Sequence, residues 1–278
     1  MVCGFWDGVG DCVEHDDALC YSVRVQASST EGSQLRSFFV PVELQRRGFQ
    51  HKPIFAELAG RGFALVNAGA VLVQPWCRWH GISTYLDCVA YADRSARSLP
   101  QGKDLNLTHV TPGRFYSAAI VFFAQAMLDN IAVWLCDALP LSVKGGDRHF
   151  LSSQFTRELK KKQGSSHALL EKHKAFVKEV NTYRQVWIHT LAGGAMPITD
   201  TNPFINPGTD DKFLRVPIDP AIQIGDENYQ ERIGQCAARN GGRYLYEISE
   251  FTGRIFESAS TFYLDWLRFA LDVCPPPS

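Results

Sequence analysis

The sequence predicts a mainly α-helical protein, in which a helical bundle over about residues 113–273 follows a small α+β unit over residues 1–100. Apolar residues recur every three or four positions along most of the second part, which is typical of helices. In the first part they alternate with polar residues over short stretches, which is typical of strands. Prolines and glycines gather between Ser95 and Gly113 and predict a linker between the two parts.

The N-terminal unit is predicted from short elements. Alternating apolar residues indicate half-buried strands at 19–27 and 38–42, and a glycine-dotted, valine-rich stretch at 63–73 indicates a third. A short helix is expected to open at Pro53, because proline is favoured in the first turn. Residues 75–79 contain two tryptophans and predict a turn that packs on a core.

The bundle is predicted to begin with a helix over 115–139, which is apolar nearly all round and therefore needs cover on more than one face. Gln125, Asp129, Asn130 and Asp137 interrupt it and exclude a lipid-facing span, so we expect a buried core helix and no membrane contact.

Three further segments complete the predicted bundle. A helix over 152–162 ends in three lysines and Gly164, and the next begins at Ser165 or Ser166 and ends at Gly193. Five prolines between 193 and 226 predict a loop with a short strand at 213–216. The last helix, over 244–273, has apolar residues at alternating steps of three and four and ends before Pro275.

Charge and cysteine content limit the function classes. Lys and Arg number 28 against 29 Asp and Glu, a net charge of −1, so any contact with nucleic acid must be a local patch. The eight cysteines form no CxxC pair, which favours a reducing compartment, and the acidic first twenty residues do not resemble a signal peptide. We therefore expect a cytoplasmic protein. Cys77, His80 and Cys88 resemble metal ligands only weakly, and we predict no metal ion and no cofactor.

The most informative stretch for function is 181–190. On an ideal helix centred on the buried Val180, Arg184 lies about 40° away, almost on the apolar stripe, while His189 lies about 180° away on the polar face. A guanidinium at the edge of the stripe is costly to bury unless an anion meets it. Because the two side chains are about 140° apart, they can share a site only if the helix loosens or a second copy of the chain completes it.

These two residue types supply the parts for cleavage of RNA without a metal ion. His189 is in the last turn, where the helix dipole favours a protonated imidazole, and a guanidinium binds phosphate oxygens. The 2′-hydroxyl of RNA is then the nucleophile. The same pair is also compatible with a helix end that charged side chains cap.

Arg184, four intervening residues and His189, near the end of a helix that follows an apolar helix and precedes a long one, resemble the motif of the HEPN superfamily of helical-bundle proteins. The resemblance covers about residues 113–273, and Gln185 stands where family members most often carry a small polar residue after the arginine. It implies a HEPN-like bundle and a homodimer that brings two motifs together. It also implies an endoribonuclease of defence or toxin type, which leaves a 2′,3′-cyclic phosphate, and an antitoxin or other protein partner.

Further residues join the predicted site. Asp129 is expected to support Arg184, with Gln125 one turn earlier on the same side. Substrate contacts are predicted for Lys178, Asn181, Thr182 and Gln185. Tyr183 and Trp187 are expected in the core, and the lysines at 160–162, 172 and 174 could steer RNA.

Two other functions remain open from the sequence. The helices could form a non-catalytic dimerisation or interaction module that binds protein or RNA, with Arg184 in a structural ion pair. Alternatively, the N-terminal half could bind a small molecule beside Trp76 and Trp79, with the helices as the dimerising part.

Overall fold

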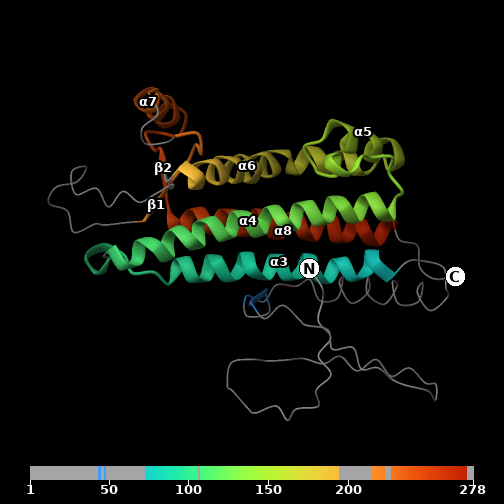
Figure 1. Cartoon of the computed structure of the whole chain (residues 1–278), viewed down its shortest axis with the longest axis horizontal. Helices are drawn as coiled ribbons and strands as arrows, with labels where there is room; N and C mark the ends of the chain where they lie inside the picture. Colours follow the sequence, from blue (N-terminus) through green and yellow to red (C-terminus); the bar gives the residue numbers. More distant parts are fainter. Residues whose placement is uncertain are drawn as a thin grey trace, which may run out of the picture.

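The computed structural model describes residues 43–44, 47, 73–105, 107–193, 214–222 and 227–273. Most of these residues are helical, which confirms the predicted mainly α class. Four long helices lie side by side, and their direction alternates along the chain (Figure 1). They are α3 (Val73–Arg97), α4 (Leu107–Ala138), α6 (Ser166–Gly193) and α8 (Ile248–Val273).

Short elements close the two ends of this bundle (Figure 1). At one end, a 3-10 turn (Gly145–Asp147) and helix α5 (Ser153–Lys162) connect α4 to α6. At the other end, α7 (Tyr229–Arg239) lies beside a two-stranded ribbon. Strand β1 (Arg215–Pro217) pairs antiparallel with β2 (Leu245–Glu247), with Val216 opposite Tyr246. A second 3-10 turn (Gly102–Asp104) joins α3 to α4.

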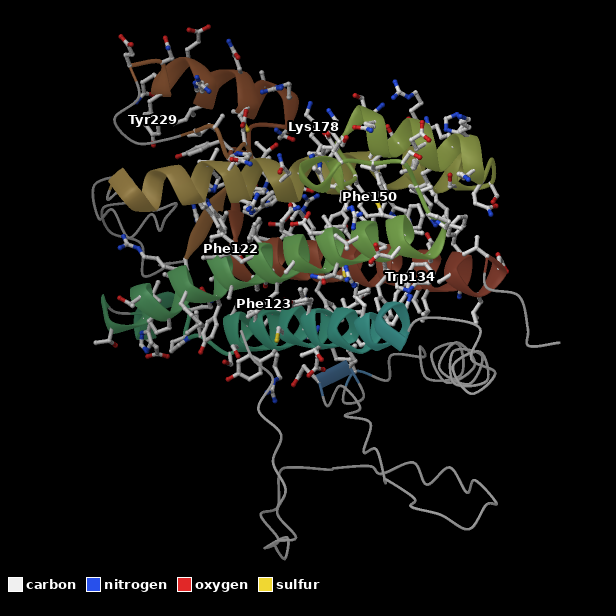
Figure 2. All side chains as sticks on the ribbon, turned by 45° about the vertical axis from the view of Figure 1, so that its right-hand side comes forward. Phe122, Phe123, Trp134, Phe150, Lys178 and Tyr229 are labelled. Atoms are coloured by element: carbon white, nitrogen blue, oxygen red, sulfur yellow. The ribbon has the colours of Figure 1, made fainter. Side chains whose placement is uncertain are left out.

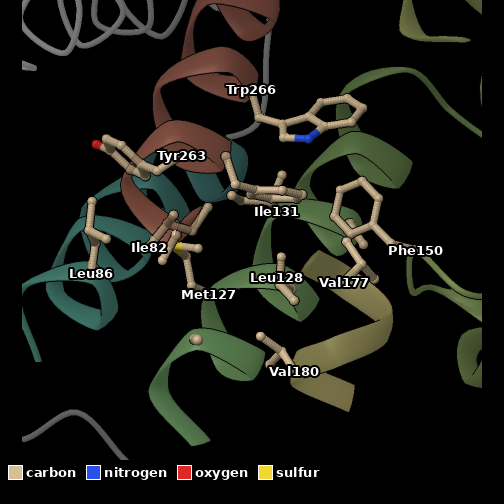
Figure 3. Packing of buried hydrophobic residues seen from close by; sticks show 14 of the residues in the cluster. Ile82, Leu86, Met127, Leu128, Ile131, Phe150, Val177, Val180, Tyr263 and Trp266 are labelled. Carbon is tan, nitrogen blue, oxygen red and sulfur yellow. The ribbon is translucent and has the colours of Figure 1, made fainter. Parts of the chain in front are cut away.

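Helix α4 occupies the centre of the core, and side chains fill the space between the helices (Figure 2). Met127, Leu128 and Ile131 of α4 are buried among side chains of the other three long helices (Figure 3). These include Ile82 and Leu86 from α3, Val177 and Val180 from α6, and Tyr263 and Trp266 from α8. The all-round apolar character of α4 is thus explained by cover on several faces.

Helix α4 also contains the segment that resembles a membrane span. In the part of the chain that the structure describes, Thr111–Ala138 is the one segment that is long and apolar enough to cross a membrane, but 67% of its most apolar stretch is buried inside the protein. This burial is what a core helix requires.

Helix α3 corrects the predicted organisation of the chain. Residues 75–79 are helical rather than a turn, and α3 packs against α4 and α8 as part of the bundle. Trp79 is fully buried and makes edge contacts with Trp134 and Tyr263, at ring-centroid distances of 5.4 and 5.7 Å. The connection between helices is shorter than the predicted linker at 95–113, because α3 continues to Arg97 and α4 begins at Leu107.

The sequence does not predict α3 because the tryptophans and Pro75 obscure an apolar stripe with helical spacing. Buried residues recur at Trp79, Ile82, Leu86 and Val89, in steps of three and four. The predicted strands at 19–27, 38–42 and 63–73 and the helix at Pro53 lie outside the described residues, apart from Val73, which opens α3.

The later elements agree well with prediction. Helix α5 begins where the sequence indicates, with the Ser152 hydroxyl accepting the Phe155 amide at 3.3 Å as an N-cap. Helix α6 ends at Gly193 and β1 overlaps the predicted strand at 213–216. Helix α8 begins at Ile248 instead of Tyr244, because residues 245–247 pair with β1. Helix α7 has no counterpart among the predicted elements.

Candidate functional site

A cavity of about 300 Å³ lies between α4, α6 and the loop that connects α4 to α5. This volume is at the lower end of small-molecule sites, which span roughly 300–1,000 Å³. Apolar side chains such as Leu128, Phe150 and Val177 form its floor. Polar side chains from all three segments complete the lining: Gln125 and Asp129 from α4, Arg148 and His149 from the loop, and Asn181, Arg184 and Gln185 from α6.

Arg184 enters the cavity from α6 because of its place on the helix. Val180, Tyr183 and Trp187 of the same helix are buried, so the neighbouring position 184 is held against α4, as the helical geometry predicts. The Arg184 side chain is half-buried, yet it makes no hydrogen bond or ion pair with any residue that the structure describes. A guanidinium in this position is stabilised by an anion that enters the cavity.

Asp129 and Gln125 form the α4 side of the site. The Gln125 Nε2 donates a hydrogen bond to Asp129 Oδ1 at 2.8 Å, while the buried Gln125 Oε1 has no hydrogen-bond partner among the residues that the structure describes. Burial raises the pKa of Asp129, and the hydrogen bond from Gln125 and the charges of Arg184 and His149 only partly oppose this rise. The structure therefore brings Asp129 near Arg184, as the sequence predicts, although no ion pair within 4.0 Å joins these two described residues.

The loop between α4 and α5 adds two residues that sequence reasoning did not single out, Arg148 and His149. Arg148 Nη1 pairs with Asp137 Oδ1 at 3.2 Å and still lines the cavity, so its charge is shared. The next residues fix His149: the Ser152 amide donates to its carbonyl at 3.0 Å, and the ring of Phe150 lies in the core beside Val177 (Figure 3).

The remaining predicted contacts divide into two groups. Asn181 and Gln185 line the cavity, one half-buried and the other exposed. Lys178 does not, because it lies on the side of α6 away from α4 (Figure 2). Thr182 is also outside the cavity lining, and its hydroxyl donates to the carbonyl of Lys178 at 2.7 Å. The backbone of His189 belongs to α6, but its side chain lies outside the described residues.

Most of the lysines proposed to steer RNA are already paired. Lys160 and Lys174 each lie 3.4 Å from a carboxylate oxygen of Glu171, and Lys172 lies 2.6 Å from Asp265. Ion pairs of this exposed kind contribute little stability, but they reduce the positive field around the lysines.

Among the described residues, no group of three or more His, Cys, Asp or Glu side chains is placed to hold a metal ion. Cys88 is a free, half-buried thiol on α3, and the side chains of Cys77 and His80 lie outside the described residues.

The cavity therefore combines groups that bind an oxyanion with groups that exchange protons. Two guanidinium groups face a single carboxyl group, which favours an anion. The imidazole and the carboxyl group can each accept or donate a proton. Comparisons of the chain with protein-family models, curated proteins and solved structures found no match. The site itself is thus the basis for any function.

Proposed function

We propose that this protein is a HEPN-like, metal-independent endoribonuclease whose cavity binds the scissile phosphate of RNA. The observation that carries the proposal is Arg184, a half-buried cation with no hydrogen-bond or ion-pair partner among the described residues, which faces a cavity that also holds a carboxyl group and an imidazole. An unpaired guanidinium at the edge of the core costs stability, and a bound phosphate offsets that cost.

The proposed reaction needs two proton transfers. The 2′-hydroxyl oxygen attacks the adjacent phosphorus atom, the bond from phosphorus to the 5′-oxygen breaks, and the products carry a 2′,3′-cyclic phosphate and a 5′-hydroxyl. One group accepts the 2′-hydroxyl proton and another donates a proton to the 5′-oxygen. Arg184 binds the non-bridging oxygens and stabilises the charge that develops on them.

Asp129 suits the role of proton acceptor. Its raised pKa makes the ionised carboxylate a stronger base than an exposed aspartate. The sequence predicts that Asp129 orients Arg184; the absence of an ion pair between these two described residues favours proton transfer instead. The sequence predicts His189 as the second proton-transfer group, and a role for it stays a prediction.

RNA is the favoured phosphodiester because of the acceptors on α4. Gln125 Oε1 is buried without a partner in the described part of the chain, and the Asp129 carboxylate lies one turn away, so this side of the cavity can accept a hydrogen bond from a hydroxyl group. RNA presents such a donor, the 2′-hydroxyl, next to each phosphate. The homodimer and the antitoxin or other protein partner that the resemblance implies stay predictions, as does cytoplasmic location.

The proposal is tested with the full-length protein and single-stranded RNA in the presence of a chelator. We expect the wild type to cleave RNA and to leave cyclic phosphate ends. Arg184→Ala should lower the cleavage rate roughly 10²- to 10³-fold, the cost of one donor to the developing charge. Its thermal midpoint should not fall, because Arg184 has no ion pair or hydrogen bond to any described residue.

Arg157→Ala is the matched control, since that side chain is 73% exposed on α5 and lies outside the cavity lining. It should cleave like the wild type. If the wild type leaves RNA intact and Arg184→Ala lowers stability, the chain is the non-catalytic helical module instead.

A further inference from the structure

His149 is a second histidine near Arg184, on the same chain. It lines the cavity together with Arg184 and Asp129, and its charge acts on Asp129. The His149 side chain is half-buried and makes no hydrogen bond or ion pair with a described residue. Its imidazole is therefore available to a ligand that enters the cavity.

The helix geometry separates Arg184 from position 189. Helix α6 continues through both positions, so the backbone at 189 lies about 7.5 Å further along the helix axis and about 140° further round it. Among the α6 residues whose side chains the structure describes, those that line the cavity lie at or before position 185, among them Val177 and Asn181. The loop brings an imidazole to the same cavity within one chain.

We infer that His149 contacts the phosphate group that Arg184 binds and donates the proton to the leaving oxygen, so that a single chain contains a complete site. This inference rests on the proposed function. Asp129 takes the proton of the 2′-hydroxyl and His149 gives a proton to the 5′-oxygen, after which solvent returns both groups to their starting states. No oxidant or other reactant is required.

The loop is built to hold His149 in place. Phe150 makes ring contacts with Phe155, Phe262 and Trp266 at centroid distances of 5.3, 5.1 and 5.1 Å, which anchor the neighbouring residue to the core. On the other side, Asp147 accepts a hydrogen bond from the Ser152 hydroxyl at 3.1 Å. A proton-transfer group must be held within hydrogen-bond reach of its substrate, and a fixed loop meets this requirement.

Three charged groups line the same cavity as His149: Asp129 from α4, Arg184 from α6 and Arg148 from the loop. Asp147 also belongs to the loop but does not line the cavity. Asp147 is turned toward Ser152, and Arg148 is paired with Asp137. Asp129 and Arg184 are therefore the charged groups beside His149 that are free to interact with a bound phosphate.

The first test compares histidine variants in the RNA cleavage assay. His149→Gln should lower the rate roughly 10²- to 10⁴-fold, the usual contribution of a proton-transfer group. His167→Gln, a control at an exposed position of α6, should keep wild-type activity. Wild-type cleavage by His149→Gln overturns the inference and leaves the proposed function standing.

The second test does not depend on cleavage. Inorganic phosphate is titrated into the full-length protein while the histidine ring signals are followed by NMR, with the His149 signal assigned from its loss in His149→Gln. We expect a saturable shift of this signal that Arg184→Ala abolishes. If the wild type leaves RNA intact, the proposed function fails, and the phosphate titration alone tests the role of His149. A shift of the His149 signal that needs Arg184 supports contact between His149 and the bound phosphate. No shift overturns the inference.

The third test asks whether one chain is sufficient. Arg184→Ala and His149→Gln chains are co-expressed and purified together. A site within one chain predicts no recovery of cleavage in the mixture, because every site lacks one group. Recovery to a sizeable fraction of the wild-type rate means that the two groups come from different chains, and it overturns the inference.

Discussion

At the scale of single residues, burial of the ionised Asp129 carboxylate destabilises the folded protein. Its carboxyl group is half-buried at the cavity, and burial raises its pKa above the ordinary value of 3.8 despite the hydrogen bond from Gln125. The folded protein therefore holds this proton more tightly than the unfolded chain does. Stability from this group is present at low pH and is lost as the pH rises from 3.8 through the raised folded value.

The variant Asp129→Asn cannot ionise and keeps an oxygen for Gln125. We expect it to be more stable than the wild type at pH 7 and to have equal stability near the acid end of the folded range, where Asp129 is protonated in both states. Urea unfolding at several pH values measures the difference. Asp104→Asn, at an exposed position, is the control and should show no such divergence. A variant that is less stable than the wild type at every pH would contradict the assignment of burial as the main cause.

At the scale of elements, α3 and α8 are joined by a buried polar cluster around Asp93. The Asp93 side chain is 0% exposed and accepts hydrogen bonds from Thr252 of α8 at 2.7 Å, from Arg97 at 3.0 Å and from Arg47 at 2.7 Å. Arg97 crosses α8 at Gly253, where an added Cβ would collide with the guanidinium. The cluster therefore fixes how the two helices approach each other.

Asp93→Ala removes the only carboxylate that these three donors share in the described structure, so they lose their common partner in the protein interior. We expect the free energy of unfolding to fall by about 1–3 kcal/mol, the usual cost of leaving a buried donor such as the Thr252 hydroxyl without its acceptor, because the two guanidinium groups are partly exposed and water can solvate them. Denaturant unfolding followed by far-UV circular dichroism measures it. Asp104→Ala, at an exposed position, should change stability by less than about 0.5 kcal/mol. A comparably small effect at Asp93 would show that the cluster is not part of the folding core.

The helices that the sequence predicts well are those with a local signal. In α5 and α6, an apolar stripe, a serine at the start and a glycine or lysines at the end all lie within one segment. The approach of Asp129 to Arg184 is also predictable, because each residue sits at a definable position on its own helix. Helix α3 was missed because Pro75 and two tryptophans resemble a turn and conceal the stripe from Trp79 onward.

Residues placed by tertiary contacts could not be found in this way. His149 belongs to a loop without a period, and its position depends on how Phe150 packs against residues more than a hundred positions away, Phe262 and Trp266. Likewise, the start of α8 depends on β1, because pairing with a distant strand removes residues 245–247 from the helical pattern. Non-local packing overrides local propensity in both cases.

At the scale of the whole molecule, the packing of α6 on α8 should weaken as the pH drops below neutrality. His173 of α6 is buried and its Nε2 lies 2.8 Å from Asp265 Oδ2 of α8. Burial lowers the pKa of His173 below 6.5, although the hydrogen bond to Asp265 opposes this change. Burial alone would raise the pKa of Asp265, but hydrogen bonds from Lys172 and His173 bring it below its usual value. Both groups thus bind protons less tightly in the folded protein than in the unfolded chain.

A group whose folded pKa is lowered contributes stability at high pH and loses it as the pH falls, so His173 acts below 6.5 and Asp265 only below 3.8. Between pH 7.5 and 5 we expect the wild type to lose stability relative to His173→Gln, which keeps a hydrogen-bond donor but cannot titrate. Asp129, whose pKa is raised, acts in the opposite direction, but it is present in both proteins and does not affect this difference. Thermal and urea unfolding of both proteins measure the two slopes, with His167→Gln at an exposed position as the control. Identical slopes of unfolding free energy against pH for the wild type and His173→Gln would mean that the packing of α6 on α8 does not respond to pH. Because α6 also presents Arg184 to the cavity, any pH dependence of the site would then arise within the cavity itself.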